Sequence, residues 1–455
     1  MDTPSQLVRD ASDANDQYWY IHGKRYDLSA YVDKHPAGSL PLELTRGREC
    51  TELLERYHSL CKRPRKMLTR FEVKESAAAG QPGGCPMRAS PFEWDETPFY
   101  DDLKTRVSAH FREQPNGGHK TPWASWALLV SFTLLTALSF VAWVLGHWYA
   151  LLTLPLFYWL GASNLMHTGG HFALSRRPWV NRLGSLMGSV HIAPATWHRQ
   201  HNIGHHAFTN LEGRDPDLNH FLQVGVPMPG FRLSPRQRWL PKYAWHRFAM
   251  ATQSMMTTAG PSILNTPEYL VDGKMGKAVP YLFSSRWAVL GHILGRLAVV
   301  AVCFVLPFFL FTPWKAAAFA AVPVLVHGWL YFAFSQVSHV NADCVPDPDL
   351  KIEWAAHQVG TSHDYRTQSR FWSVFSIGLN NQIVHHLFPQ VAPWHYPALA
   401  KIVAATCETH GVPYRTSPTW TAAFRKLLNH TAALNDPAPA GVAPVAAVEP
   451  APLAE

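Results

Sequence analysis

The chain has 455 residues, of which 47% are hydrophobic and only 16% are charged. A typical globular domain has about 25% charged residues, so this composition excludes a mainly disordered chain or a coiled coil. The net charge of +8 favours an anionic membrane surface over nucleic acid as a partner, because the longest basic run covers only residues 62–66. Histidine is unusually frequent, with 25 copies, and it is the commonest metal ligand.

The N-terminal region reads as a small polar domain over residues 17–62, preceded by a segment, 1–16, that we expect to be disordered. Two histidines of this domain, His35 and His58, are 23 residues apart. A linker is predicted over residues 63–96, because Gly and Pro interrupt it too often for a stable element.

Four apolar runs follow, each long enough to cross about 30 Å of hydrocarbon as a helix. They form two hairpins with short connections and cover residues of about 123–145, 148–166, 288–311 and 316–337. Lys and Arg are concentrated between and after the hairpins, which places both termini and these regions in the cytosol by the positive-inside rule. The Pro/Ala-rich segment 431–455 is predicted to be disordered. The expected fold is therefore mainly α, a four-span transmembrane helical bundle with a cytosolic helical cap.

Three histidine clusters lie at the predicted cytosolic ends of these runs. They are HTGGH at 167–171, HRQHNIGHH at 198–206 and QIVHH at 382–386, and His339 lies just beyond the last apolar run. Each cluster alone is as consistent with structural, solvated or pH-sensing histidines as with a metal site. Three clusters at one end of a bundle supply enough imidazoles for two metal ions with open positions, so the metal interpretation is favoured.

The spacing within the clusters predicts which side chains lie together, because residues three or four apart share one face of an α-helix. His201 should therefore lie beside His205, while the adjacent His206 points about 100° away and can serve a second ion. In the third cluster, the same rule sets Gln382 beside His385. Imidazole suits iron, copper and zinc, whereas the lack of Cys and the few carboxylates argue against zinc ribbons, iron–sulfur centres and soluble carboxylate-bridged di-iron proteins.

The motifs HxxxH, HxxxHH and QxxHH resemble the three histidine boxes of membrane fatty acid desaturases, and we assign residues 97–430 to such a domain. Gln382, in place of the first His of the third box, resembles the front-end subgroup, which inserts a cis double bond between an existing one and the carboxyl end. The resemblance implies an O2-dependent desaturase of polyunsaturated acyl chains, with Δ5 or Δ4 selectivity favoured over Δ6. Val384 departs from the family, which usually has Glu there.

The resemblance also implies two iron ions and their protein ligands. These ligands would be His167, His171, His201, His205, His206, His339, His385 and His386, with Gln382 at the remaining position. The same residues, His339 excepted, are the predicted catalytic set. For His198, three roles stay open: a ligand, a hydrogen-bond partner of a ligand, or a bystander.

Other residues near the boxes have weaker assignments. A structural role is favoured for three histidines that lack a repeated spacing, namely His191, His357 and His363. Asp215, Asp217 and Asn380 either hold imidazole tautomers or cap helices.

The N-terminal motif resembles cytochrome b5, because HPAG at 35–38 is followed by Gly47, Thr51 and His58. The resemblance implies a small α+β domain that holds haem b between His35 and His58. Desaturation reduces O2 to water and needs two electrons besides those from the substrate. A fused carrier would supply them, with an NADH-dependent cytochrome b5 reductase as the donor.

The expected substrate is a fatty acyl lipid or an acyl-CoA, and the expected location is the endoplasmic reticulum membrane, with the active site on the cytosolic side. We expect no nucleic acid partner. Two enzymatic alternatives stay open: a di-iron membrane hydroxylase or ketolase, and a desaturase of sphingolipid long-chain bases. A non-enzymatic alternative is a membrane haem electron carrier whose histidine clusters bind zinc or respond to pH.

Overall fold

The computed structural model describes residues 17–74, 90–114, 118–222, 228–258, 274–275, 279–280, 286–347 and 351–437. The predicted disordered N-terminus lies outside these ranges, as does most of the predicted C-terminal tail. The first residues of that tail, however, complete the helix α21 (Trp420–Asn435). The tail prediction therefore begins too early, because Thr431 and Asn435 are buried and Asn435 Oδ1 accepts a hydrogen bond from the Arg232 amide.

The N-terminal unit is an antiparallel hairpin with short helices around a small core. Its elements are β1 (Trp19–Ile21), β2 (Lys24–Tyr26), η1 (Ser29–Lys34), α2 (Leu40–Glu43), α3 (Thr51–Tyr57) and α4 (Arg63–Leu68). Trp19, Ile21 and Tyr26 are buried in the core, and Leu68 and Phe71 pack against it. The predicted linker therefore also begins too early, since burial of these last two apolar side chains ties residues 63–71 to the unit.

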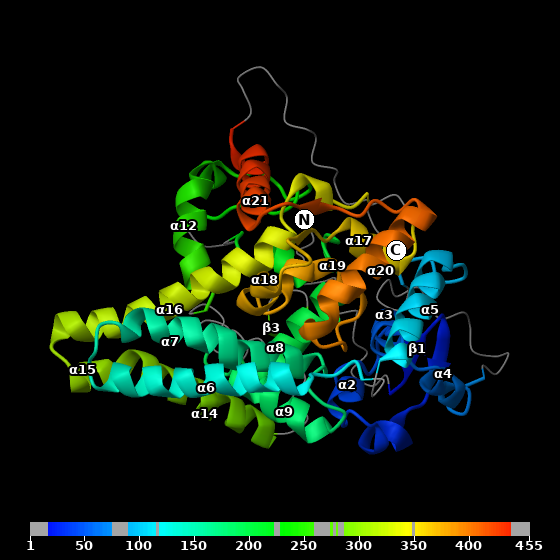
Figure 1. Ribbon diagram of the computed structural model, residues 1–455, viewed down its shortest axis with the longest axis horizontal. Coiled ribbons are helices and arrows are strands. Elements are labelled where there is room, and N and C mark those ends of the chain that lie inside the picture. The colour runs from blue at the N-terminus through cyan, green and yellow to red at the C-terminus, as the bar shows by residue number, and fades with distance from the viewer. Residues whose placement is uncertain are drawn as a thin grey trace.

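Apolar helices form two hairpins that extend together away from the rest of the molecule (Figure 1). In the first hairpin, α6 (Trp123–Val144) is followed by α7 (Ala150–Tyr158), the π-helical η3 (Trp159–Ser163) and α8 (Asn164–Gly170). In the second, α14 (Arg286–Val300), η8 (Ala301–Val305) and α15 (Leu306–Leu310) are followed by α16 (Pro313–Ser335) and η9 (Gln336–Ser338). The Thr121 amide donates to Ala173 O, so the first hairpin returns to the level at which it started.

Three helices of the described chain are long and apolar enough to cross a membrane, namely Trp123–Val144, Val289–Leu310 and Pro313–Ser338. The predicted second span is not among them, so the four-span prediction is not confirmed. The run from α7 to α8 is interrupted by η3, and its second half carries the polar residues Asn164 and His167. Large apolar side chains cover the outside of the bundle; Leu138 is 65% exposed and Phe309 is 82% exposed, as a lipid-facing surface requires.

Short helices from distant parts of the chain form a cap at one end of the bundle. They are α5 (Pro98–Glu113), α9 (Pro178–Met187), α10 (Pro194–Trp197), η4 (His198–His205), α11 (His206–Phe208), η5 (Pro216–Asn219), η6 (Pro241–Trp245), α12 (His246–Met256), η10 (Ala342–Cys344), α17 (Trp354–Gly360), α18 (Arg370–Phe375), η11 (Leu379–Asn381), α19 (Gln382–Leu387), η12 (Pro393–His395), α20 (Tyr396–His410) and α21. Two small strand pairs join them, the antiparallel β3 (Lys274–Met275) with β4 (Val279–Pro280) and the parallel β5 (Asp364–Tyr365) with β6 (Thr416–Ser417). The protein is mainly helical, as predicted.

Two hydrophobic cores fix the elements that carry the histidine clusters. In the first, Tyr100 of α5, Trp354 of α17 and Leu387 of α19 are buried together, so the third cluster lies between packed helices. In the second, Trp159 of η3 stacks on Phe334 of α16, with ring centroids 5.7 Å apart. This contact ties the first hairpin to the second, about two turns before the first histidine cluster in the chain.

Candidate metal centre and haem site

The histidine clusters meet where the cap joins the bundle. The first cluster lies at the end of α8, the second in η4 and α11, and the third in α19, while His339 directly follows η9. Eight of the nine predicted ligands are buried, and the ninth, His201, is half-buried. Burial of uncharged imidazoles in one place is costly unless their nitrogens find a shared partner.

A first histidine group consists of His167, His171, His201 and His385, with one nitrogen of each within 4.8 Å of the others. The Nε2 atoms of His171 and His201 are 3.1 Å apart. Two nitrogens bound to one ion at a right angle, with bonds of about 2.1 Å, lie about 3 Å apart. Both ring nitrogens of His167 and Nε2 of His385 are buried without a hydrogen-bond partner among the described residues. This donor set fits a metal ion.

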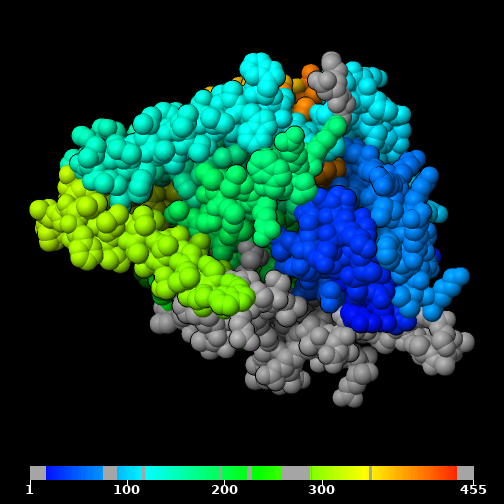
Figure 2. All heavy atoms as spheres, turned by 90° about the horizontal axis from the view of Figure 1, so that it is seen from below, coloured from blue at the N-terminus to red at the C-terminus, as the bar shows by residue number. Residues whose placement is uncertain are grey.

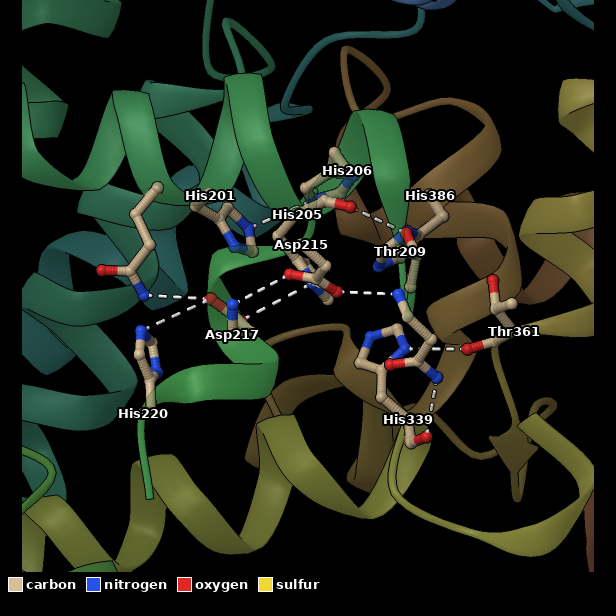
Figure 3. A network of polar contacts seen from close by, with 12 residues as sticks. His201, His205, His206, Thr209, Asp215, Asp217, His220, His339, Thr361 and His386 are labelled. Atoms are coloured by element: carbon tan, nitrogen blue, oxygen red, sulfur yellow. Dashed lines mark hydrogen bonds and ion pairs between the residues drawn. The ribbon is translucent and has the colours of Figure 1, made fainter. Parts of the chain in front are cut away.

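A second histidine group consists of His205, His339 and His386, again with one nitrogen of each within 4.8 Å of the others. Gln382 joins it, since its side-chain Nε2 lies 2.8 Å from His339 Nε2 and 3.2 Å from His386 Nε2. Gln382 Oε1 is buried and has no hydrogen-bond partner in the described part of the chain. A half-turn of the amide would aim this oxygen at the same point as the two imidazoles. Figure 3 shows the three histidines of this group converging from three segments.

His206 lies between the two groups. Its Nε2 is 3.0 Å from His201 Nε2, and its ring stacks on that of His386 with a centroid separation of 4.2 Å. The rings of His201 and His205 stack with centroids 5.5 Å apart, as predicted, but their nitrogens belong to different groups, and His206 lies beside His201 as well. The wider turn of the π-helix η4, whose backbone hydrogen bonds join residues five apart, brings His206 as well as His205 to the side of His201.

The prediction for the third cluster needs a correction. Gln382 lies beside His386, four residues on, and not beside His385, which turns into the first histidine group. Helical neighbours three and four residues apart both lie near Gln382, so the rule of spacing alone does not choose between them. His339, 43 residues upstream, makes the choice, because it contacts Gln382 and belongs to the second group.

Uncharged hydrogen-bond partners orient the outer nitrogen of several of these imidazoles. Nδ1 of His385 lies 3.1 Å from the Tyr396 hydroxyl, and Nδ1 of His339 lies 3.0 Å from Thr361 O. When an imidazole binds a metal through Nε2, its Nδ1–H donates to such a partner, which fixes the tautomer and the ring plane.

The outer nitrogens of His171 and His386 also have partners that are far away along the chain. Nδ1 of His171 lies 3.1 Å from the Tyr57 hydroxyl, and Nδ1 of His386 lies 2.8 Å from Gln358 Oε1. Tyr57, Gln358, Thr361 and Tyr396 were not singled out from the sequence, and no local motif marks them.

His205 has a charged partner. Its Nδ1 lies 3.1 Å from Asp215 Oδ2 and 3.6 Å from Asp217 Oδ2 (Figure 3). Burial alone would lower the pKa of His205, but the negative charges of the two aspartates outweigh it and raise the pKa to about 9. Asp215 also caps η5 by accepting from the Asp217 amide, so both roles left open for Asp215 are present. Asn380, by contrast, donates to Arg366 O.

The other imidazoles of the site carry no charge at neutral pH. Burial lowers the pKa of His201, His206 and His386 well below its usual value, and the neighbouring imidazoles lower it further. Neutral imidazole is the form that binds metal ions. The site therefore presents a prepared set of nitrogen donors.

Four further histidines lie outside both groups. His357 Nε2 bonds to Thr209 O, His363 Nε2 to Ser417 Oγ, and His191 Nδ1 to Thr258 Oγ1, which agrees with the structural role favoured for each. His198 is buried and bonds through Nδ1 to Asn202 Nδ2 at 3.0 Å. It faces a cavity of the N-terminal unit.

That cavity has a volume of about 640 Å³ and lies between His35 and His58. Their ring centroids are 6.2 Å apart. Two imidazoles on opposite faces of one iron, with bonds of about 2 Å, have their centroids about 6 Å apart. His35 Nδ1 bonds to Gly38 O at 3.2 Å, which directs Nε2 into the cavity, and burial lowers the pKa of His58 to about 4. The residues present fit a haem.

Fold and site together define a helical membrane protein with two histidine groups that fit metal ions and a small domain whose cavity fits a haem. A family model described as fatty acid desaturase matches residues 142–418, and one described as cytochrome b5-like heme/steroid binding domain matches residues 3–75. The chain therefore belongs to the fatty acid desaturase family, and it carries a cytochrome b5-like domain at its N-terminus.

Curated relatives match nearly the whole chain. It is 31% identical to the acyl-lipid omega-13 desaturase of Chlamydomonas reinhardtii, over 87% of this chain and 89% of that protein. It is 30% identical to Delta(5) fatty acid desaturase A of Dictyostelium discoideum, over 93% and 92% of the two chains. It is 29% identical to the acyl-lipid (8-3)-desaturase of Physcomitrium patens, over 91% and 87%. The protein is thus an oxidoreductase that acts on lipid, with a domain that implies haem.

Proposed function

We propose that this protein is a front-end acyl desaturase that inserts a cis double bond into polyunsaturated fatty acyl chains, with Δ5 or Δ4 selectivity. One observation carries the proposal: two adjacent groups of imidazoles, buried except for the half-buried His201 and uncharged except for His205, lie at the cap end of the apolar bundle. The Delta(5) relative and the Gln of the third box support the front-end assignment. The substrate is an acyl lipid or an acyl-CoA.

The proposed ligands of two iron ions are the two histidine groups, with His206 between them and Gln382 in the second. When bound, the iron pair supplies the O2-dependent removal of hydrogen from an unactivated methylene, which no acid or base side chain can perform. The chain's own residues hold the donor nitrogens in place. Tyr396 and Thr361 fix two of the imidazole tautomers, and the charge of Asp215 increases the donor strength of His205.

A small cavity of about 30 Å³ lies on the bundle side of the ligands. His167 and His205 form part of its wall, together with Trp159, Tyr331 and Ile377. We propose that an acyl chain reaches the metal centre from this side, because its wall continues into the apolar bundle. Buried aromatic side chains there exclude water from the reacting methylene.

We propose four membrane crossings, with both termini and the metal centre on the cytosolic side of the endoplasmic reticulum. The helical segment from Ala150 to Gly170 runs back along α6 to the cap, and this supports the fourth crossing. Electrons would enter through the haem between His35 and His58, and an NADH-dependent reductase would supply them.

Expression in yeast supplied with single polyunsaturated acids tests the function. Gas chromatography with mass spectrometry should show a product two hydrogens lighter, with the new double bond on the carboxyl side of the existing ones. The variants His205→Ala and His385→Ala, one from each histidine group, should abolish it. A product heavier by one oxygen would indicate a hydroxylase, and desaturated long-chain bases would indicate a sphingolipid enzyme. Zinc without iron in an inactive protein would indicate a carrier.

A further inference from the structure

The N-terminal unit is docked on the cap rather than held only by its connection. Figure 2 shows the unit (blue) packed against segments of the cap and bundle (green). Its helix α3 buries charged side chains at this contact: Glu52 is 1% exposed and Arg56 is 0% exposed. Arg56 Nη2 donates to Asn202 O at 2.6 Å, and Gln390 Nε2 donates to Ser59 Oγ at 2.7 Å.

The docked unit shares one wall of its haem cavity with the cap. Phe172, His198, Asn202 and Ile203 line the cavity and belong to the segments that carry the first and second histidine clusters. The two candidate redox sites are therefore separated by a few side chains and not by solvent.

One of these side chains, Tyr57, touches both sites. It precedes His58 in the chain, it lines the haem cavity, and its hydroxyl lies 3.1 Å from His171 Nδ1. His171 belongs to the first histidine group. Since a ligand imidazole bound through Nε2 carries its proton on Nδ1, His171 Nδ1–H donates to the Tyr57 oxygen. A chain of covalent bonds and one hydrogen bond thus connects His58 to His171.

Phe172, which belongs to the cap, supplies a second connection between the haem cavity and the first histidine group. It directly follows His171, its ring lines the haem cavity, and the ring meets that of Tyr57 edge to face at 5.9 Å. Its φ of +58° is rare for a bulky residue and costs free energy, so the surrounding structure must enforce it. Lys120 does so in part, because its Nζ donates to Phe172 O at 2.8 Å and to Gln390 O at 3.1 Å.

We propose that Tyr57 and Phe172 form the bridge along which electrons pass from the haem site to the metal centre. In each transfer, one electron leaves a ferrous haem at His58, which becomes ferric, and the metal centre at His171 is reduced by that electron. Tyr57 keeps its proton, and neither bridge residue is oxidised overall. Two such transfers, each followed by re-reduction of the haem by an external reductase, supply the two electrons that desaturation requires. The inference rests on the proposed function.

The test uses the full-length protein, loaded with haem and iron, in lipid nanodiscs without O2 or acyl substrate. A flavin flash reduces the haem, and the decay of the ferrous absorbance reports transfer to ferric iron at the metal centre. The variant Tyr57→Phe, which loses the outer hydrogen-bond partner of His171, should slow this decay by about tenfold. Phe172→Leu, which removes the aromatic ring between the two sites, should slow the decay as well. Tyr100→Phe is the matched control. It removes another buried tyrosine hydrogen bond to α3, at 3.2 Å to Glu55 O, which touches no ligand, so the decay should be unchanged.

Haem absorbance, iron content and the haem midpoint potential are measured on every variant and should match the parent protein. A decay that is unchanged in both bridge variants would overturn the bridge and leave the proposed function standing. A parent protein whose ferrous haem persists, with iron present, would instead contradict the proposed electron delivery itself. Loss of iron in proportion to the lost rate in both variants would show that these residues only hold the site together, and would also overturn the bridge.

Discussion

At the scale of single residues, the outer nitrogens of the imidazoles distinguish the two histidine groups. His205, in the second group, faces the carboxylate of Asp215, whereas His171 and His385, in the first, face the hydroxyls of Tyr57 and Tyr396. A carboxylate partner raises the basicity of a ligand imidazole more than a hydroxyl does. We therefore expect the second group to hold its ion more tightly.

The first prediction concerns Asp215. The variant Asp215→Asn keeps an oxygen for the Asp217 amide but loses the charge beside His205, so iron affinity should fall by about 10–100-fold at one of the two sites. Titration with a chelator, followed by the iron content per protein, measures this. Asp343→Asn is the control, because Asp343 pairs with Lys426 at the surface. Identical iron retention in the two variants would contradict the prediction.

The second prediction concerns Asp364, which is buried beside the third cluster and accepts hydrogen bonds from the Ile383 amide and the Tyr414 hydroxyl. Burial raises its pKa to about 7, above its ordinary value of 3.8. The folded protein therefore holds the proton of Asp364 more tightly than the unfolded chain does. The contribution of Asp364 to the free energy of unfolding is largest below a pH of about 4 and is lost as pH rises through about 7. The loss amounts to about 4 kcal/mol.

Thermal melting at several pH values checks this. The variant Asp364→Asn cannot titrate, so its melting temperature should rise relative to the parent protein as pH increases across this range. A difference between the two proteins that stays constant with pH would contradict the assignment.

At the scale of elements, close helix contacts fix the directions of His167 and His171, the first two proposed ligands. α8 crosses α9 at Gly169, between His167 and His171. A Cβ on Gly169 would lie 2.7 Å from Asn181 O and 2.9 Å from Ser185 N. Because both are backbone atoms of α9, they cannot move aside without shifting the helix.

The third prediction follows from this contact. The variant Gly169→Ala should destabilise the protein by about 1–3 kcal/mol and lower its iron content, because α8 must tilt and carries two of the proposed ligands with it. The control is Gly291→Ala in α14, where a Cβ meets nothing within 4 Å. Alanine is the better helix former there, so stability should be equal or higher by up to about 1 kcal/mol. Equal melting temperatures and iron contents for both variants would contradict the prediction.

At the scale of the whole molecule, the histidine clusters lie at one end of the bundle and the hairpin turns at the other. A Cβ on Gly146, in the first turn, would lie within 2.9 Å of Phe311, in the second turn. Both hairpins therefore reverse at the same level, which is the arrangement that four crossings require.

The fourth prediction tests this topology. In sealed microsomes, tags at both termini should be cleaved by external protease, whereas a tag inserted between α15 and α16, beside Thr312, should be protected. Protection of one terminus alone would indicate three crossings. Permeabilised microsomes, in which every tag should be cleaved, provide the control.

Features that depend on neighbours along the chain could be predicted from the amino-acid sequence. The apolar runs, the histidine pair of the N-terminal unit and the placing of His167 with His171 follow from composition and helical spacing. These features also identified the family, because each motif is local.

The arrangement of distant segments relative to one another could not be predicted in this way, because it depends on tertiary packing. The widened turn of η4 brings His206 as well as His205 to His201, which helical spacing did not predict. His339 draws Gln382 towards His386, against the prediction for the third cluster. Tyr57 and His171 are 114 residues apart, and no spacing rule relates them. Helical geometry fixes contacts within one or two turns, whereas such pairs form only when distant segments pack into a common core.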